Sequence, residues 1–274
     1  PYAKDPREQF FNWSFLTHGA WDYAADACGY SVGAMVEYRT STWAVRAARM
    51  ALPRESNGLA LDGHWRRYYG DQIEAESDLP VSVPAGPLRA RVLAFRNRAV
   101  MGRFDDALAQ AGTPDVAQVR RAQAKTGWGV TLEVPLGEDA GLFLRASRNS
   151  GQAETYAFTE IDRQFALGGQ FSGAAWGRGN DRWGLAWAAN GLSLPHRSYL
   201  AAGGQGFFLG DGRLNYGPEQ VLEAYYRWAL PGVATAAGTL QSAFSLGVQH
   251  LVHPGYNRDR GPVQVYSLRW HSEF

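Results

Sequence analysis

Apolar and polar residues alternate along most of the chain, with the period of a β-strand. Residues 128–134, 183–189 and 222–230 mostly place an aromatic or aliphatic residue at every second position. Successive side chains on a strand point to opposite faces, so each run predicts a strand with one apolar and one polar face. Such runs predict strands at 29–40, 42–53, 70–82, 86–100, 126–136, 140–148, 160–175, 182–193, 218–230, 240–251 and 262–274. The weak alternation of 86–100 predicts a β-bulge there.

The connections between these strands alternate between short and long. Residues 40–41, 84–85, 137–139 and 179–181 are short and rich in turn formers, whereas 54–69, 101–125, 149–159, 194–217 and 252–261 are long. The small, Gly/Ala-rich stretch 231–239 is intermediate. Outer-membrane barrels have tight periplasmic turns and long outer loops. The pattern therefore predicts an all-β fold, a transmembrane antiparallel β-barrel of the outer membrane, with residues 1–274 in one domain.

The direction of the strands leads to a further expectation about the start of the chain. The last strand must run inward to the periplasmic side, so strand 29–40 also runs inward and residues 1–28 are expected to lie outside. Bacterial single-chain barrels have even numbers of strands, and this chain has about 11–12. We therefore expect either a further strand at residues 9–16 or, preferably, upstream strands that this sequence lacks. One helix is expected at 104–123, with Asp115 in a first turn.

Composition narrows the class of protein only slightly. The 274 residues carry a formal net charge of +1, which gives no reason to expect a nucleic-acid partner. Ten tryptophans and 32 glycines suit a many-stranded sheet with aromatic girdles. Cys28 is the only cysteine, so no disulfide framework is present. No apolar run is long enough for a transmembrane helix, and the opening residues lack the apolar core of a signal peptide.

Three groups of residues could carry chemistry. The glycine-rich stretch 203–212 lacks the spacing and context of a phosphate-binding loop. His250 and His253 would point to opposite faces of a strand, which is poor metal geometry. Ser193, His196 and Tyr199 cluster in a long loop without a carboxylate at a suggestive spacing, although a triad is formed in space and not in sequence.

Charged residues share the polar faces of several predicted strands. Glu74, Glu76 and Asp78 lie on one such face, and Glu219 and Glu223 on another. Paired carboxylates can hydrolyse glycosides, but a polar channel wall shows the same pattern. Opposed arginines and carboxylates would polarise a narrow passage and hydrogen-bond passing hydroxyl groups. The candidate basic wall residues are Arg46, Arg89, Arg91, Arg145, Arg227 and Arg269.

Several longer motifs are similar to those of one known family. Residues 193–204, 210–219 and 253–263, together with the opening stretch 5–23, resemble the carbohydrate-selective porin family of Gram-negative bacteria, the OprB type. The resemblance covers essentially the whole chain. It implies a single-chain outer-membrane barrel of about sixteen strands that passes glucose and related sugars by diffusion and needs no cofactor. Family members are longer, so the resemblance implies that this chain begins about five strands into the family sequence.

The resemblance does not identify the sugar-binding residues, which we predict from their positions. The candidates are Trp13, Trp21, Glu74, Glu76, Arg89, Arg145, Tyr199, Asp211, Glu219, Glu223, Arg227, Arg258, Asp259 and Arg260. Several of them could instead shape the loops: Asp259 could pair with a neighbouring arginine, Glu219 could cap a turn, and Trp13 and Trp21 could pack a loop inward.

The expected partners are sugars, outer-membrane lipid, and a partner chain or a second copy that completes the barrel. Two other functions remain open. One is an outer-membrane barrel enzyme acting on glycan or lipid through His196 or the paired acids, and the other is a structural component of an envelope complex.

Overall fold

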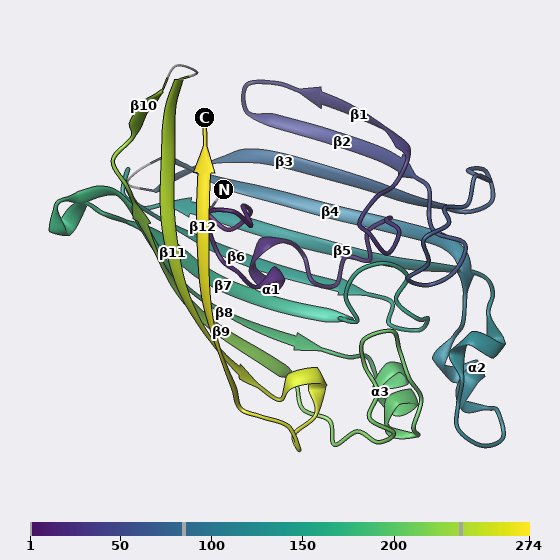
Figure 1. Cartoon of the computed structure of the whole chain (residues 1–274). Coiled ribbons are helices and arrows are strands. Elements are labelled where there is room, and N and C mark those ends of the chain that lie inside the picture. Colours follow the sequence, from purple (N-terminus) through teal and green to yellow (C-terminus); the bar gives the residue numbers. More distant parts are fainter. Residues whose placement is uncertain (1, 84–85, 236–237) are drawn as a thin grey trace.

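The computed structural model describes residues 2–83, 86–235 and 238–274, and they form one antiparallel 12-stranded sheet (Figure 1). Neighbouring strands follow the chain order from β1 to β9, then β11, with β10 and β12 both paired to β11. The strands are β1 (Gly33–Arg39), β2 (Trp43–Met50), β3 (Tyr69–Val83), β4 (Gly86–Met101), β5 (Arg121–Pro135), β6 (Ala140–Asn149), β7 (Arg163–Gly173), β8 (Arg178–Gly191), β9 (Glu219–Ala229), β10 (Val233–Thr235), β11 (Gly238–Val252) and β12 (Val263–Glu273).

The predicted strands coincide with β1–β9, β11 and β12, and β10 is a short addition within the stretch 231–239. The predicted bulge is misplaced. The register of β3 and β4 shifts between Leu79 and Ser82, so the irregularity lies in β3. The predicted turn at 84–85 lies outside the described residues.

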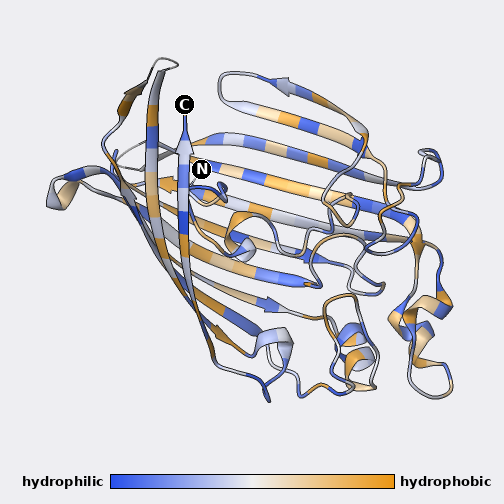
Figure 2. Cartoon of the chain, in the orientation of Figure 1, coloured by the Kyte–Doolittle hydropathy of each residue, from blue (hydrophilic) through white to orange (hydrophobic). Residues whose placement is uncertain are grey.

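The apolar stripes of the strands face outward, away from the inside of the curved sheet. Trp128 on β5, Leu167 on β7 and Leu246 on β11 are 48%, 44% and 62% exposed. Figure 2 shows apolar and polar bands alternating along the strands, as a period of two requires. An aqueous globule would bury these side chains, whereas a transmembrane barrel presents them to lipid.

The long connections gather at one end of the sheet and hold most of the helical turns (Figure 1). These are α2 (Phe104–Leu108), η1 (Val116–Val119), α3 (Leu194–Ala201) and η3 (Pro254–Tyr256), while η2 (Ala174–Trp176) lies in the connection between β7 and β8. None of the helices in the described ranges has the length and apolar composition needed to cross a membrane.

The helix expected at 104–123 is wrong in extent. Gly112, with a φ of +85°, and Pro114 separate α2 from η1, and β5 already begins at Arg121. Asp115 does begin a helical turn, because its side chain accepts a hydrogen bond from the Ala117 amide. Helix α3 was not predicted, although Ser193 caps its first turn.

Residues 2–28, which we call the inner segment, lie along the inside of the sheet and contradict the prediction that they lie outside. The segment contains one short helix, α1 (Trp13–Leu16), and follows the concave side of the strands (Figure 1). Phe10 and Phe15 are fully buried against Phe143 of β6 and Tyr225 of β9. Counting strand directions predicts only on which side of the membrane the chain lies just before β1. It does not predict whether the residues before that point fold back inside the sheet.

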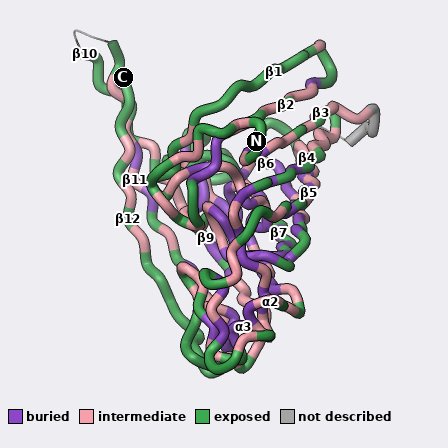
Figure 3. The backbone as a smooth tube through the Cα atoms, turned by 90° about the vertical axis from the view of Figure 1, so that its right-hand side faces the viewer, coloured by how far each residue is buried: buried purple, intermediate pink, exposed green. Residues whose placement is uncertain are grey.

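Burial is uneven around the sheet. Figure 3 shows exposed stretches along β1, β10 and β12, and buried stretches among β5–β9 and the loops with α2 and α3. Among the described residues, β1 pairs only with β2, and β12 pairs only with β11. The sheet therefore has two free edges, and its most buried part lies where the inner segment contacts it.

Candidate functional site

Side chains from β9 hold the first half of the inner segment. The buried carboxylate of Glu223 accepts hydrogen bonds from the backbone amides of Phe11 (2.6 Å) and Asn12 (2.9 Å). Four residues further along the same face, Arg227 donates to Glu8 at 2.7 Å. Glu223 and Arg227 were predicted to contact sugar, but in the structure they bind the inner segment.

Arg145 of β6 binds the same segment through its backbone carbonyl groups. The buried guanidinium donates to the carbonyl oxygens of Ala3 (3.1 Å), Phe15 (2.6 Å) and Thr17 (3.2 Å). A guanidinium has five donors in a planar fork, so one arginine can satisfy several carbonyl groups that would otherwise be buried without partners. Arg145 therefore fixes the path of the segment across the sheet.

A buried ion pair holds the far end of the inner segment. The Lys125 ammonium group on β5 lies 3.2 Å from the Asp22 carboxylate, and both side chains are almost completely buried. Asp22 also accepts hydrogen bonds from the amides of Tyr156 (2.9 Å) and Ala157 (2.9 Å) in the loop after β6. The segment is thus tied both to the sheet and to an outer loop.

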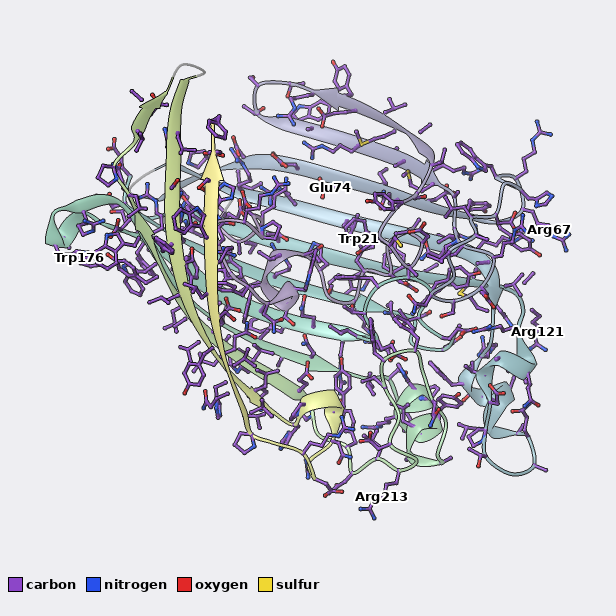
Figure 4. All side chains as sticks on the ribbon, viewed as in Figure 1. Trp21, Arg67, Glu74, Arg121, Trp176 and Arg213 are labelled. Atoms are coloured by element: carbon purple, nitrogen blue, oxygen red, sulfur yellow. The ribbon has the colours of Figure 1, made fainter. Side chains whose placement is uncertain are left out.

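Between the inner segment and strands β1–β6 lies a polar cavity of about 480 Å³. Trp21, Thr17 and His18 of the inner segment line it on one side, and Glu74 and Glu76 of β3 on the other. Figure 4 shows Trp21 and Glu74 on this inner side of the sheet. The arginines of the lining are Arg39, Arg46, Arg89, Arg91 and Arg145.

Charges of opposite sign alternate from strand to strand across the wall of this cavity. The register places Arg46 of β2 directly opposite Glu74 of β3, and Glu76 of β3 opposite Arg91 of β4. Arg46 lies 2.7 Å from Glu74, and Arg91 lies 2.8 Å from Glu76 and 3.0 Å from Glu133 of β5. We call this row the charge ladder.

The charge ladder is only partly buried, apart from Glu133, whose side chain is 4% exposed. The Arg46, Arg91 and Glu76 side chains are 20%, 15% and 20% exposed. Each guanidinium has five donors and each carboxylate several acceptor sites, so the paired groups keep further capacity toward the cavity. The wall can therefore both donate hydrogen bonds to and accept them from a neutral, hydroxyl-rich solute.

The structure brings five of the predicted site residues to the cavity and places the other candidates elsewhere. The five are Trp21, Glu74, Glu76, Arg89 and Arg145. Trp13 lines a separate pocket of about 220 Å³, where its ring packs edge-on against Phe158. Arg46 and Arg91 were predicted only as wall residues. His18 was missed, because no sequence signal places the inner segment inside the sheet.

The remaining candidates lie in the outer loops. Tyr199 is buried, and its hydroxyl donates to the Gln205 carbonyl at 2.9 Å. Glu219 accepts a hydrogen bond from the Gly255 amide (2.9 Å), which is the turn-capping alternative. Asp259 accepts from the Asn215 side chain at 2.8 Å, and Asp211 pairs with Arg260. Arg258 lies beside Gly217, which has no side chain to occupy that space.

The loop cluster around His196 has the residue types of a catalytic triad but not its geometry. His196 Nδ1 lies 2.9 Å from Asp162 Oδ2, but the Ser193 hydroxyl donates to the Gly151 carbonyl at 2.5 Å. The imidazole is 1% exposed and stacks on Phe104 with ring centroids 4.3 Å apart. These contacts tie the loop to α2 and the start of α3.

The two carboxylates of this cluster respond differently to their surroundings. Burial raises the pKa of Asp162, but the His196 imidazole beside it has the opposite effect, and the net result is a pKa below the ordinary range. Burial also raises the pKa of Glu160, and in this case it outweighs His196 and the two loop amides that bind the carboxylate. The two neighbouring carboxylates therefore have pKa values displaced in opposite directions, downward for Asp162 and upward for Glu160.

One group of side chains has the donor types of a cation site. Glu8, His271 and Glu273 each bring a ligand atom within 4.8 Å of the others. Glu8 is already paired with Arg227, which offsets its charge. His250 and His253 do not meet at a site, since His250 contacts Gln264 and His253 bonds to the Pro218 carbonyl.

Comparison with known proteins gives two kinds of result. The sequence profile of the carbohydrate-selective porin, OprB family, matches residues 2–274. Among solved structures, the high-pH structure of Pseudomonas putida OprB matches with a TM-score of 0.62 and 17% identity, over 87% of this chain. Pseudomonas aeruginosa OccK11 (OpdR) matches with a TM-score of 0.49 and 12% identity, over 88% of this chain and 58% of its own. No curated protein matches the sequence.

The likeness to OprB is a likeness of fold, since the identity is low. The present chain spans 58% of the length of that solved porin. The family profile, in contrast, extends over nearly every residue of the chain. The exposed apolar stripes and the collected long loops agree with both comparisons. The chain therefore belongs to the carbohydrate-selective porin, OprB family, and is a porin-type β-sheet protein of the bacterial outer membrane.

Proposed function

We propose that the chain lines a channel for the passive, selective diffusion of glucose and related sugars across the outer membrane. The observation that carries the proposal is the polar cavity between the inner segment and the charge ladder. The inner segment narrows the space enclosed by the strands, so a solute must pass close to the ladder. Diffusion of this kind needs no cofactor.

The chemistry of the wall suits a neutral polyol. Arg46 and Arg91 can donate to sugar hydroxyl groups and Glu76 can accept from them, so together they replace hydrogen bonds to water. Arg39, Arg46, Arg89 and Arg91 are each paired with a carboxylate and contribute little net charge, whereas Lys4 and Arg145 make the wall slightly positive. The Trp21 ring adds an apolar surface against which the less polar face of a sugar ring can lie. Binding must stay weak, because a channel has to release its solute.

We further propose that the chain acts as a channel and not as an enzyme. The nearly complete burial of His196 and the bond from the Ser193 hydroxyl to the Gly151 carbonyl support this, because the imidazole is shielded from solutes and the hydroxyl is not bonded to it. A hydrolysis assay on glycan and lipid substrates tests the alternative with the His196→Ala and Glu219→Gln variants. Activity in the parent protein that either substitution removes would contradict the channel proposal.

The free edges of β1 and β12 carry a proposal about partners. An unpaired backbone amide in hydrocarbon costs several kcal/mol, so an exposed strand edge is not stable in lipid. We propose that both edges pair with further strands in the membrane, from the same polypeptide or another copy. Cysteine cross-linking from β1 and β12, followed by mass measurement, checks this, and edges that never cross-link would contradict it.

Reconstitution into planar bilayers tests the sugar pathway. Glucose should reduce single-channel conductance in a concentration-dependent manner, and Glu76→Gln and Trp21→Ala should weaken this block. Arg213→Gln is a matched control, because Arg213 is exposed on a loop away from the cavity (Figure 4). Conductance that is insensitive to glucose, or a block that persists unchanged in both cavity variants, would contradict the proposed pathway.

A further inference from the structure

A second polar pocket lies beside the outer loops, where β6 ends and β7 begins. It has a volume of about 320 Å³ and is lined by Arg148 of β6, Arg163 of β7 and Arg197 of α3, with Ser150 and Gln152 between them. The pocket is separate from the cavity beside the inner segment, and the proposed sugar pathway does not use it.

The arginines of this pocket are arranged unfavourably unless an anion lies between them. Arg148 and Arg163 are directly opposite each other in the β6–β7 register, and both are exposed. Like charges in such a cross-strand pair are destabilising. Among the described residues, no carboxylate forms an ion pair with Arg148, Arg163 or Arg197.

The neighbouring groups neutralise only part of these charges. Arg163 only reaches the Tyr216 hydroxyl at 3.4 Å, and the Arg197 guanidinium lies over the Tyr216 ring at 5.2 Å. Asp162 lines the same pocket, but its Oδ2 is bound to His196 and to the Ser193 amide. The pocket therefore sets three guanidinium groups against the single carboxylate of Asp162, so it keeps an excess of positive charge.

The position of the pocket indicates which anion would reach it. Trp128 of β5 stands opposite Arg148 on the same outward face, and Phe165 and Leu167 continue that face along β7. The pocket thus lies at the border between the lipid-facing apolar band and the long outer loops. A ligand at this border would place an anionic head among the arginines and acyl chains against the band.

We propose that Arg148, Arg163 and Arg197 bind the phosphate group of an outer-leaflet glycolipid, whose acyl chains lie along the apolar face below. A guanidinium matches two phosphate oxygens at once, which makes arginine well suited to this group. The inference rests on the outer-membrane location of the chain and is independent of the solute that passes the channel.

Lipid binding by the protein purified from outer membranes in detergent tests the proposal. Native mass spectrometry would compare bisphosphorylated lipid A with a dephosphorylated lipid of the same acyl chains. We expect at least about tenfold tighter binding of the phosphorylated lipid, as charge-assisted hydrogen bonds provide. The double variant Arg148→Gln/Arg163→Gln should lose this preference, and Arg213→Gln should keep it. Equal binding of the two lipids, or a preference that survives the double variant, would overturn the proposal.

Two further measurements separate the alternatives. Glucose block of conductance in the same variants reports whether the channel is folded, and it should be unchanged when lipid binding is lost. If the double variant does not fold, the single variant Arg197→Gln in α3 replaces it in the lipid-binding measurement. An unchanged preference for the phosphorylated lipid in that variant would then refute the proposal. Inorganic phosphate, added at the same concentration as the lipid, should displace little of the bound lipid. If phosphate competes as well as a second phosphorylated lipid does, the pocket is a site for free phosphate instead.

Discussion

The two halves of the inner face of the sheet use the same residue types for different purposes. Along β1–β5, arginines and glutamates pair with one another across strands and border a cavity, as Arg46 does with Glu74. Along β6–β9, Arg145 and Glu223 bind backbone groups of the inner segment and are buried. We call these the ladder half and the anchor half, and we count the buried Lys125 near the start of β5 with the anchors because it pairs with Asp22 of the inner segment.

The difference between the halves follows from what lies opposite each strand. In the anchor half, Phe10 and Phe15 of the inner segment exclude water, so a charged side chain there must bond to the protein. In the ladder half the strands face the cavity, and the charges remain partly hydrated. The alternation of apolar and polar residues makes the inner face polar in both halves. Whether a charged side chain on that face is buried or can be reached by a solute depends on whether the inner segment covers it.

The largest effect should come from breaking the buried ion pair at the end of the inner segment. Lys125→Met leaves the Asp22 carboxylate buried and unpaired, which should destabilise the fold by roughly 3–5 kcal/mol. Chemical denaturation in detergent measures this. The double variant Lys125→Met/Asp22→Asn should recover much of the lost stability. If Lys125→Met is as stable as the parent, the ion pair does not hold the inner segment in place.

A somewhat smaller effect is expected from Glu223→Ala, which removes the acceptor of the Phe11 and Asn12 amides. The loss of two hydrogen bonds to a carboxylate should cost roughly 3 kcal/mol and release the first half of the inner segment. Single-channel conductance should rise, and the segment should become sensitive to protease. Glu223→Gln keeps one acceptor oxygen, so its conductance and protease sensitivity should lie between those of the parent and of Glu223→Ala. An unchanged conductance in Glu223→Ala would argue against an anchoring role.

As the pH is lowered, the loop cluster around His196 should lose stability only at pH values below the ordinary range of aspartate titration. The folded pKa of Asp162 is lowered, so its contribution to stability is present above the unfolded value of about 3.9 and is lost as pH falls through the folded value. Hydrogen exchange at Ser193 should therefore stay slow until the pH is below the ordinary aspartate range. Asp162→Asn should make this exchange fast at neutral pH, and early loss of protection in the parent would contradict the assignment.

The smallest change in stability is expected in the ladder half. Arg46→Gln removes pairs with Glu37 and Glu74 that are only partly desolvated, so it should cost about 1 kcal/mol or less. The same variant should weaken glucose block by about tenfold, because one charged donor is lost from the cavity wall. A large loss of stability with unchanged block would place Arg46 with the anchors and contradict the distinction between the halves.

Much of the fold could be predicted from the chain because strand signals are local. The runs at 128–134 and 183–189 lie within β5 and β8, and their apolar residues face outward as a barrel in lipid requires. Loop length also identified the end where the long connections gather. The site was less accessible to this reasoning, because the pairing of Glu76 with Arg91 depends on the register of two strands, and a shift of one residue would reverse every face.

The sequence by itself determined the strands, their lipid-facing stripes and the supply of charges for the inner face, since a period of two needs only neighbouring residues. Only the tertiary structure decided that residues 2–28 fold back along that face. That placement depends on long-range contacts, such as those of Phe10 with Tyr225 and of Asp22 with Lys125. Residues so distant in the chain meet only after the sheet has curved, so no local pattern records which charges the segment covers and which it leaves beside the cavity.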